Sequence, residues 1–195
     1  MPITSPLYAA VKNNHIKATE LLLEHKANPN ILVDGTTPLH IASEYGYLDI
    51  MRLLLDYNAS LIIPNSLDAL PIHRAIAGGI KAFKLLLQYG ADMNSKKGKF
   101  DMMQMIAYLD TTADILKWFI DMGMDINAKT YDDAPLLHIA AFYNNMNTAT
   151  MLIDHGIDIH YKALYKATAY DVGISNKAKG HDVANLLHRL MNTSQ

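Results

Sequence analysis

The stretch Thr37-Pro38-Leu39-His40-Ile41-Ala42 decides the fold, because parts of it return along the chain at a nearly fixed interval. Its histidine, followed two residues later by alanine, recurs as His73 with Ala75 and as His138 with Ala140. The column that contains this histidine reads, in chain order, Tyr8, His40, His73, Met105, His138 and Asp171, with steps of 32 or 33 residues. Such self-similarity indicates a repeat protein, in which each unit buries its apolar face only against its neighbours.

A second column of apolar residues runs in phase with the first. It reads Leu21-Leu22-Leu23, Leu53-Leu54-Leu55, Leu85-Leu86-Leu87, Trp118-Phe119-Ile120, Met151-Leu152-Ile153 and, two residues late, Leu186-Leu187-His188. Each unit therefore carries two segments that can bury apolar side chains. We read each unit as a helix, a turn, a second helix and a hairpin loop.

The second unit shows this pattern best. Thr37 is a good N-cap and Pro38 suits the first helical position, so we expect a short helix from there to about Tyr45. A second helix is expected over about 49–57. Asn58 follows it, where later units have glycine, and both residues are typical of a left-handed helix end.

Composition narrows the class of protein. The chain has 195 residues, of which half are hydrophobic and 18% charged, so it can bury a continuous core, and we expect one domain from Met1 to Gln195. A formal charge of −2 argues against nucleic acid or an anionic membrane as partner. The absence of cysteine excludes disulfides and thiolate zinc sites.

No Sec-type signal peptide and no membrane-spanning segment are evident in the sequence. Its start, Met1–Pro6, lacks the basic and apolar regions of a Sec signal peptide, and no apolar run is long enough to span a membrane. We expect a cytoplasmic protein or, if it is an effector, one delivered into a host cell.

The motif Gly35-Thr36-Thr37-Pro38-Leu39-His40-Ile41-Ala42, with the following leucine triplet and the later stretch Leu85-Leu86-Leu87-Gln88-Tyr89-Gly90-Ala91-Asp92-Met93-Asn94, resembles the consensus of the ankyrin-repeat family. The resemblance covers nearly the whole chain. It implies an all-α ankyrin-repeat solenoid of about six helix-turn-helix units with hairpin loops, whose first and last repeats act as caps. It also implies a concave side formed by the hairpin tips and the first helices. We expect repeats at about 5–34, 35–66, 67–98, 99–131, 132–163 and 164–195.

Departures from the pattern are informative. The fourth repeat reads Asp101-Met102-Met103-Gln104-Met105-Ile106-Ala107, without the usual Thr, Pro and His, and Thr111 replaces the glycine between its helices. Because methionine fills gaps without specifying one packing, we expect residues 99–115 to be the softest part of the array. The fifth repeat moves its proline by one place to Pro135, and the first has Lys26 where the helix-end glycine belongs.

No catalytic motif is evident. The sequence lacks a Gly-x-Ser-x-Gly nucleophile turn, a phosphate-binding glycine loop and a His-Glu-x-x-His pair, so we expect no enzyme, no catalytic residue and no cofactor. The resemblance implies that His40, His73 and His138 pack and form hydrogen bonds. Their spread along a stack also prevents them from sharing a metal ion.

One metal site is kept as an alternative to the expectation of none. His155, Asp158 and His160 lie close enough in sequence to reach one ion, although they fall where the other repeats have an ordinary loop.

The resemblance also indicates which positions face the groove. Two of them lie late in each first helix: Lys12 and Asn13, Glu44 and Tyr45, Ala77 and Gly78, Leu109 and Asp110, Phe142 and Tyr143. Others lie at hairpin tips, including Tyr131, Asp132 and Tyr165. Large aromatic residues that a core does not need are typical of binding hot spots. The partner-binding residues expected from these positions are Glu44, Tyr45, Leu109, Asp110, Tyr131, Asp132, Phe142, Tyr143 and Tyr165. The opposing interpretation is that Phe142 and Tyr143 fold back between adjacent repeats.

The function expected is a non-enzymatic protein–protein interaction module that acts as an adaptor, inhibitor or scaffold. An aromatic surface with acidic neighbours suits a helix or an extended peptide with basic or mixed character. We expect a monomer, and the composition also suits an effector of an intracellular bacterium or a virus. The alternative is the recognition segment of a larger multidomain enzyme.

Overall fold

The computed structural model describes residues 5–95, 102–109, 113–127, 134–163 and 166–193. These residues form twelve α-helices, and the chain divides into two compact units, Met1–Gly98 (unit 1) and Lys99–Gln195 (unit 2). Each unit is taken by itself below. The all-α class is confirmed in the described part of the chain, whereas the expected single domain stays a prediction.

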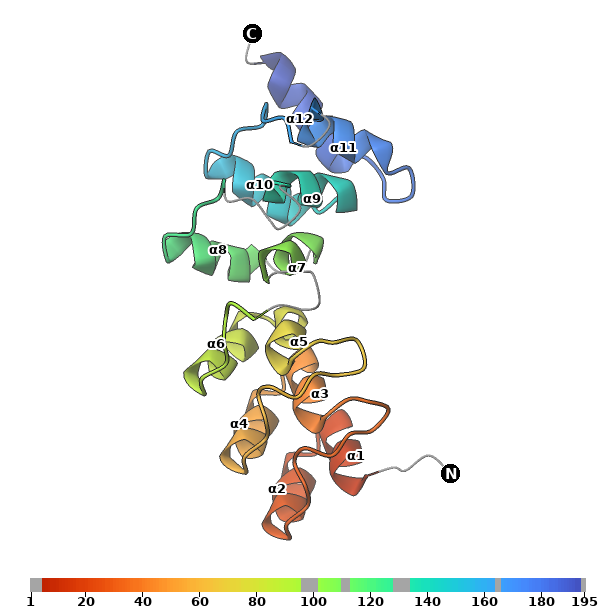
Figure 1. Ribbon diagram of the computed structural model, residues 1–195, viewed down its shortest axis with the longest axis vertical. Helices are drawn as coiled ribbons and strands as arrows, with labels where there is room; N and C mark the ends of the chain where they lie inside the picture. The colour runs from red at the N-terminus through yellow and green to blue at the C-terminus, as the bar shows by residue number, and fades with distance from the viewer. Residues whose placement is uncertain (1–4, 96–101, 110–112, 128–133, 164–165, 194–195) are drawn as a thin grey trace. The chain divides into compact units, whose positions relative to one another are not determined.

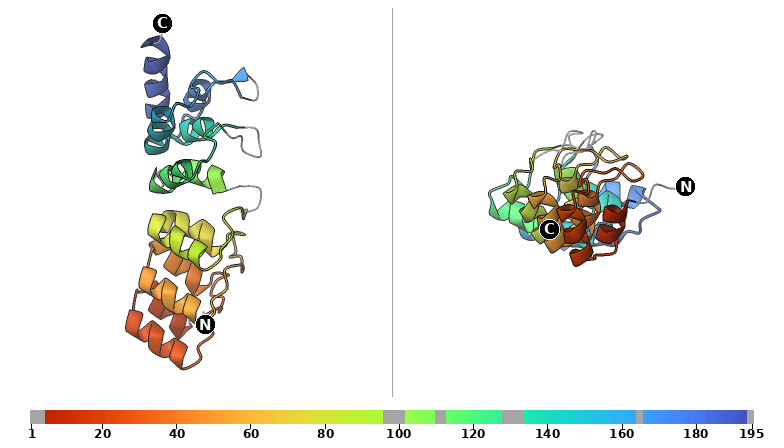
Figure 2. Two further views of the ribbon diagram at one scale, coloured as in Figure 1. Left: turned by 90° about the vertical axis from the view of Figure 1, so that its left-hand side faces the viewer. Right: turned by 90° about the horizontal axis from the view of Figure 1, so that it is seen from below.

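Unit 1 consists of three helix pairs. Its helices are α1 (Pro6–Lys12), α2 (Ile16–Glu24), α3 (Pro38–Tyr45), α4 (Leu48–Asp56), α5 (Pro71–Gly78) and α6 (Ile80–Gln88). The first helices pack in chain order, α1 on α3 and α3 on α5, and the second helices α2, α4 and α6 form a parallel row (Figures 1 and 2). Each of the first three expected repeats therefore contains one of these pairs.

The helices of unit 1 begin where local chemistry favours it. Thr37 caps α3, because its hydroxyl accepts a hydrogen bond from the His40 N–H at 3.4 Å. Proline occupies the first turn of α1, α3 and α5, where its missing N–H costs nothing. The bounds of α3 match the expectation, and α4 begins and ends one residue earlier than expected. Asn58 has a φ of 64°, which confirms the left-handed helix end.

The core of unit 1 lies between consecutive helix pairs. Leu39, Ile50, Leu54, Ile76 and Phe83 are fully buried. They come from the helices of the second and third pairs, so each repeat supplies one layer of the core and closes that of its neighbour.

Buried histidines connect one repeat to the next. His40 is fully buried and its Nε2 lies 2.8 Å from the carbonyl oxygen of Ala69. A carbonyl only accepts, so Nε2 carries the proton, and Nδ1 accepts from Thr37, whose Oγ1 lies 2.7 Å away. His73 Nε2 lies 3.2 Å from the Ser95 carbonyl, at the end of its own repeat (67–98). The structural role expected of these residues is confirmed.

One glycine allows α3 and α5 to approach closely. A Cβ atom added at Gly78 would lie 1.9 Å from the carbonyl oxygen of Ser43, far inside any real contact. Gly78 was expected at a groove position, and its lack of a side chain also allows two repeats to stack closely.

Unit 2 also consists of three helix pairs. Its helices are α7 (Met102–Tyr108), α8 (Ala113–Asp121), α9 (Leu136–Tyr143), α10 (Met146–Asp154), α11 (Ala169–Ser175) and α12 (Asp182–Thr193). The first helices α7, α9 and α11 pack in chain order, as do α8, α10 and α12 (Figure 1). The fourth repeat thus forms both of its helices without the usual cap, while Asp101 and Thr111 lie outside the described residues.

Two adjacent asparagines join the three pairs of unit 2. Asn144 ends α9 with a φ of 59°, and its side chain accepts from the Val183 N–H at 3.0 Å and donates to Asp182 at 2.9 Å. Buried Asn145 donates to the carbonyl oxygen of Ala107. One short turn is therefore bonded to both neighbouring repeats, which the sequence pattern alone did not indicate.

Candidate partner-binding surface

The groove face of each unit is defined here as the C-terminal ends of the first helices together with the adjoining loops. Of the nine expected binding residues, Glu44 and Tyr45 lie in unit 1, and Leu109, Phe142 and Tyr143 lie in unit 2. The remaining four, Asp110, Tyr131, Asp132 and Tyr165, lie outside the described residues. The surface is therefore built separately for each unit.

Tyr45 is the most prominent aromatic residue of the groove face in unit 1. It is the last residue of α3, its side chain is 59% exposed, and its ring stacks on Tyr47 with centroids 5.5 Å apart and planes 18° apart. Stacking restricts the rotamers of both rings before any partner arrives. An exposed aromatic ring that is already ordered loses little entropy on binding.

The carboxylate of Glu44 is paired inside the protein. It forms an ion pair with Arg74 of the next first helix, α5, and both side chains are about 30% exposed. Glu44 was expected to be an acidic neighbour available to a basic partner. Its charge is largely offset by Arg74, so this part of the surface offers a mixed pair rather than a negative patch.

Tyr8 joins the same part of the face, in the place that histidine takes in other repeats. Its pKa lies above the usual value, first because burial disfavours the phenolate and then because Asp34 and Glu44 carry nearby negative charge. The tyrosine is therefore a neutral hydroxyl at physiological pH, able to donate or accept a hydrogen bond.

Unit 2 carries an aromatic cluster of three rings. Tyr143 lies edge-on to Tyr108 of α7 with centroids 4.6 Å apart, and edge-on to Phe142 at 5.0 Å. Tyr108 is 52% exposed and Phe142 is 38% exposed, while Tyr143 is half-buried between them. The opposing interpretation was that Phe142 and Tyr143 fold back between adjacent repeats. It holds in part for Tyr143, because this ring packs against the neighbouring repeat. The other two rings remain largely open.

Leu109 follows directly on this cluster. Its N–H donates to the Met105 carbonyl at 3.2 Å, which extends the bonding of α7 by one residue, and its side chain is half-buried. It therefore borders the aromatic cluster and adds apolar area to it.

A small apolar hollow adjoins the cluster. It has a volume of about 240 Å³ and lies between α9, α11 and the loop that precedes α11. It is lined by Ala134, His138, Ile139, Phe142, Tyr143, Ala163 and Val172. Hollows of this kind, beside exposed aromatic residues, are where partner side chains anchor.

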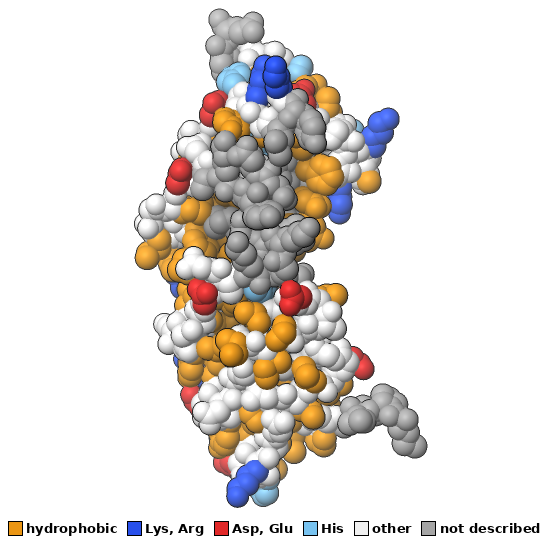
Figure 3. Space-filling view, in the orientation of Figure 1, with side chains coloured by type: hydrophobic (Ala, Val, Ile, Leu, Met, Phe, Trp, Pro, Cys, Tyr) orange, Lys and Arg blue, Asp and Glu red, His pale blue; other side chains and the backbone are white. Residues whose placement is uncertain are grey.

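Sequence reasoning missed several members of this surface. Arg74 lies three residues, and Tyr108 one residue, from positions that the repeat register singles out, and only their contacts reveal them. Two aliphatic loop residues of unit 1 were also missed, Leu32 at 52% and Ile62 at 79% exposure. Figure 3 shows hydrophobic side chains spread across the lower half of the view, which is unit 1.

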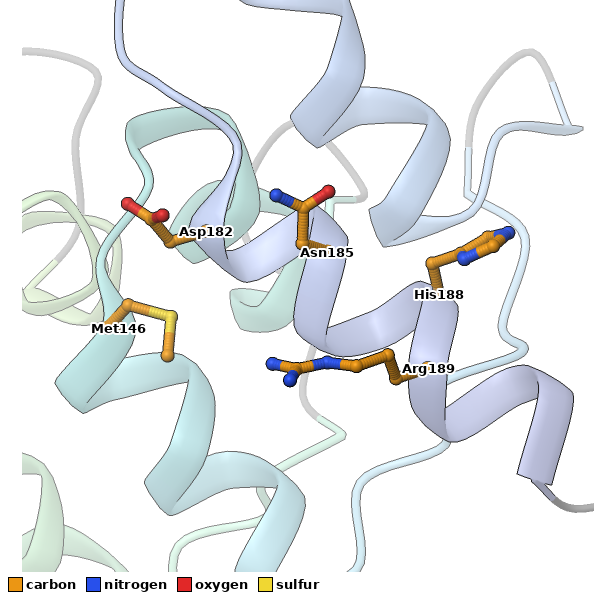
Figure 4. Close-up of a pocket in the computed structure, with 5 residues that line it drawn as sticks. All are labelled: Met146, Asp182, Asn185, His188 and Arg189. Atoms are coloured by element: carbon orange, nitrogen blue, oxygen red, sulfur yellow. The ribbon is translucent and has the colours of Figure 1, made fainter.

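A larger hollow of unit 2 lies away from the groove face. It measures about 610 Å³ and is lined by Met146, Asp182, Asn185, His188 and Arg189 of α10 and α12. Arg189 points toward Met146, whereas His188 points to the other side of α12 (Figure 4). The polar groups diverge and Asp182 is already bonded to Asn144, so the hollow presents no convergent site.

The alternative metal site gains no support from the described geometry. His155 Nδ1 lies 2.7 Å from the Met151 carbonyl, and Asp158 accepts from the backbone N–H of His160 at 2.9 Å. Among the residues that the structure describes, no three His, Asp or Glu side chains are placed to hold one ion. Within the same residues, no helix is long and apolar enough to cross a membrane.

Comparison with known proteins agrees with this architecture. The family model described as ankyrin repeats in three copies matches residues 3–65, 34–97 and 72–163. The solved structure of the human ASB11 ankyrin repeat domain superimposes with a TM-score of 0.66 at 19% identity, covering 95% of this chain and 97% of that one. That likeness establishes the ankyrin-repeat fold.

Two curated relatives illustrate the range of proteins that share the sequence pattern. A transient receptor potential cation channel subfamily A member 1 homolog of Caenorhabditis elegans is 27% identical over 183 residues, covering 92% of this chain. A putative ankyrin repeat protein of Rickettsia bellii is 32% identical over 114 residues, covering 45% of this chain. The chain spans only 15% of the first relative and 48% of the second.

Proposed function

The chain belongs to the ankyrin-repeat family, a family of protein–protein interaction modules, and from that premise we propose that it binds a protein partner on its groove face. One observation supports the proposal most directly. Large aromatic rings are exposed at the C-terminal ends of the first helices, although other residues of the same helices are buried. Tyr45 in unit 1, and Tyr108 and Phe142 in unit 2, are the anchors.

The proposed mechanism is burial of ordered aromatic rings. Each fully covered aromatic side chain contributes roughly 1.5–3 kcal/mol, and the rings are held by neighbouring rings, so little ordering cost opposes binding. The other proposed contacts are Glu44, Leu109, Asp110, Tyr131, Asp132, Tyr143 and Tyr165. A helix or an extended peptide with apolar residues and mixed charge fits this set, because Glu44 and Arg74 offer both signs.

We propose further that the chain works as a monomeric adaptor, inhibitor or scaffold, with its six repeats in one array. The relative in Rickettsia bellii supports the idea of a bacterial effector delivered into a host cell. The small share of its relatives that the chain spans favours the second candidate, a recognition segment within a larger protein.

The test removes the anchor Tyr45 together with Tyr143, the ring against which both anchors of unit 2 pack. Tyr45→Ala with Tyr143→Ala should reduce capture of the partner by more than about tenfold in a pull-down read by mass spectrometry, followed by titration of the captured protein. Tyr57→Ala with Met122→Ala is the matched control, because these exposed residues follow the second helices. Capture that survives the first pair, or that is lost equally in the control, would show that the partner uses another surface. Circular dichroism confirms that both variants keep their helices.

A further inference from the structure

Ile62 is an exposed aliphatic residue at a position where the other repeats have a polar one. The N–H of Ile62 donates to the side chain of Ser60, as the N–H of Asn94 donates to that of Asp92, so the turn itself is the same in both repeats. Only the side chain differs, and that of Ile62 is 79% exposed. The column of equivalent positions reads Asn30, Ile62, Asn94, Asn127 and His160.

The fold does not explain this isoleucine. In the preceding repeat the side chain of Asn30 donates to the Asn58 carbonyl at 3.2 Å and accepts from the Ser60 N–H at 2.7 Å, which joins one hairpin loop to the next. Ile62 can form neither bond, and its exposed surface gains nothing from burial. Because the free protein is less stable for it, the isoleucine points to a contact with another molecule.

Ile62 has an aliphatic neighbour in the adjacent loop. The loop after α2 and the loop after α4 lie side by side (Figures 1 and 2). The bonds of Asn30 join them at one end, and the Ser66 N–H donates to the Gly35 carbonyl at 2.9 Å near the tips. Counted between these bonds, Leu32 lies opposite Ile62, and it is 52% exposed. The two side chains therefore form one apolar pair that spans two repeats.

The tips beyond this pair are acidic. Asp34 and Asp68 are exposed tip residues, and among the residues that the structure describes neither forms an ion pair. Leu67 precedes Asp68 and is 62% exposed. The three aliphatic residues and the two carboxylates, defined here as the loop patch, are Leu32, Ile62, Leu67, Asp34 and Asp68.

We propose that the loop patch binds a segment of the protein partner that presents an apolar side chain to the aliphatic pair and lysine or arginine to the two carboxylates. The aliphatic pair supplies the area that is buried. The carboxylates favour basic residues in that segment and repel acidic ones, because charges at the rim of an interface act mainly on encounter and specificity. The proposal rests on the proposed function for the protein nature of the partner, and it adds the charge of the segment that contacts the loops.

The first test asks whether Ile62 serves the fold. Ile62→Asn restores the residue that the column has in the repeats on either side, with the same opportunity to bond to the next loop. This variant should therefore unfold at the same or a higher temperature than the unmodified protein, measured by circular dichroism. A clearly lower unfolding temperature would show that the isoleucine stabilises the protein itself and would overturn the proposal.

The second test measures binding to the full chain with peptides, so it needs no identified partner. Random peptides displayed on phage are panned against the protein, and the enriched peptides should combine an apolar residue with lysine or arginine. The most frequent one, synthesised with a fluorescent label, should bind Ile62→Asn about tenfold more weakly, since the burial of one aliphatic side chain is lost. Leu21→Asn is the matched control, because Leu21 is 55% exposed on α2, outside the two loops, and this variant should bind as the unmodified protein does.

A third variant tests the charges. Asp34→Asn with Asp68→Asn keeps the backbone, because asparagine tolerates the φ of 49° and 56° at these positions. The same peptide should bind this variant about three- to tenfold more weakly, and added salt should weaken its binding less than it does in the unmodified protein.

Several results would overturn the proposal. They are the absence of any enriched peptide, a preference for acidic peptides, equal binding to Ile62→Asn, and an equal loss in the Leu21→Asn control. Sedimentation that finds a dimer, which Ile62→Asn converts to a monomer, would show that a second copy covers the loop patch and would also overturn it. None of these results decides the groove face, which the Tyr45 and Tyr143 variants test.

Discussion

At the scale of single residues, the buried histidines have the clearest consequences. His40 and His138 each donate from Nε2 to a carbonyl 29 residues further along the chain, at the start of the next repeat. A neutral ring is needed at both positions, because burial disfavours the imidazolium and, at His40, Nδ1 must accept from Thr37. The stability of the stack therefore depends on pH.

We expect stability to fall as pH drops below about 6.5, the value near which the unfolded histidines take up protons. The pKa of His40 and of His138 is lowered in the folded protein, so between the folded and unfolded values the unfolded chain binds more protons. Each residue removes at most about 1.4 kcal/mol per pH unit in that window. Urea unfolding at pH 7.5 and 5.5 measures this loss of stability. An unfolding midpoint that is unchanged or higher at pH 5.5 would contradict the prediction.

Asp171 provides an internal comparison in the same column. Hydrogen bonds from the Thr168 N–H and hydroxyl lower the pKa of its carboxyl group. The stabilisation that ionised Asp171 gives the folded protein is present above about pH 3.8, and it is lost only as the pH falls below that value. Any loss between pH 7.5 and 5.5 therefore belongs to histidines.

At the scale of the helix, packing rather than propensity decides which positions tolerate change. Gly78 ends α5, and its hydrogen atoms meet the α3 backbone where any larger group would collide. The repeat register cannot reveal this, because the equivalent positions in the neighbouring repeats, Tyr45 and Tyr143, carry large aromatic side chains. Only the distance between two backbones distinguishes a stacking glycine from a groove position.

Gly78→Ala should destabilise the protein by at least about 2 kcal/mol, since the new methyl group overpacks against a backbone oxygen that cannot turn away. Gly90→Ala is the matched control. No atom lies within 4 Å of its added Cβ, so it costs only the strain of a left-handed residue, roughly 1–2 kcal/mol. Thermal unfolding of both variants measures the difference, and an equal or smaller loss at position 78 would show that the two helices separate without cost.

The fourth repeat is the weakest pair of helices by composition. Its first helix, α7, lacks the Thr-Pro start of α3 and contains three of the chain's eleven methionines. We expect the backbone amides of α7 to exchange with solvent faster than those of α5 and α9, measured by hydrogen exchange with mass spectrometry or NMR. Equal protection in the three helices would mean that burial of Ile106 and Ala107 compensates for the missing cap.

At the scale of the whole molecule, periodicity was sufficient to predict the class of fold. Two apolar columns in phase indicate helix pairs, and each expected repeat range holds one pair, with α3 found at the expected residues. The repeat period could not predict contacts between residues that occupy non-equivalent positions in their repeats. The Glu44–Arg74 ion pair, the Tyr108–Tyr143 contact and the bonds of Asn144 and Asn145 all join residues whose separation in sequence carries no repeat signal.

The candidate surface was predicted in outline for the same reason. Family register places Tyr45 and Phe142 at the ends of first helices, and both are exposed there. It does not reveal that Glu44 is paired with Arg74, that Tyr143 is half-buried, or that Nδ1 of His138 has no donor among the residues that the structure describes. Each of these features depends on a neighbouring side chain. An alignment of equivalent repeat positions carries no information about such neighbours.

The histidine bonds also bear on how such a gene can change length. A bond from His40 to Ala69 reaches only into the following repeat, and the bond from His138 to Ala167 does likewise. Tandem duplication or loss of about 33 codons would give every histidine a new carbonyl in the old place, whereas an insertion of any other length within a helix pair would leave one orphaned. Related genes should therefore differ by whole numbers of repeats, with smaller insertions confined to hairpin tips.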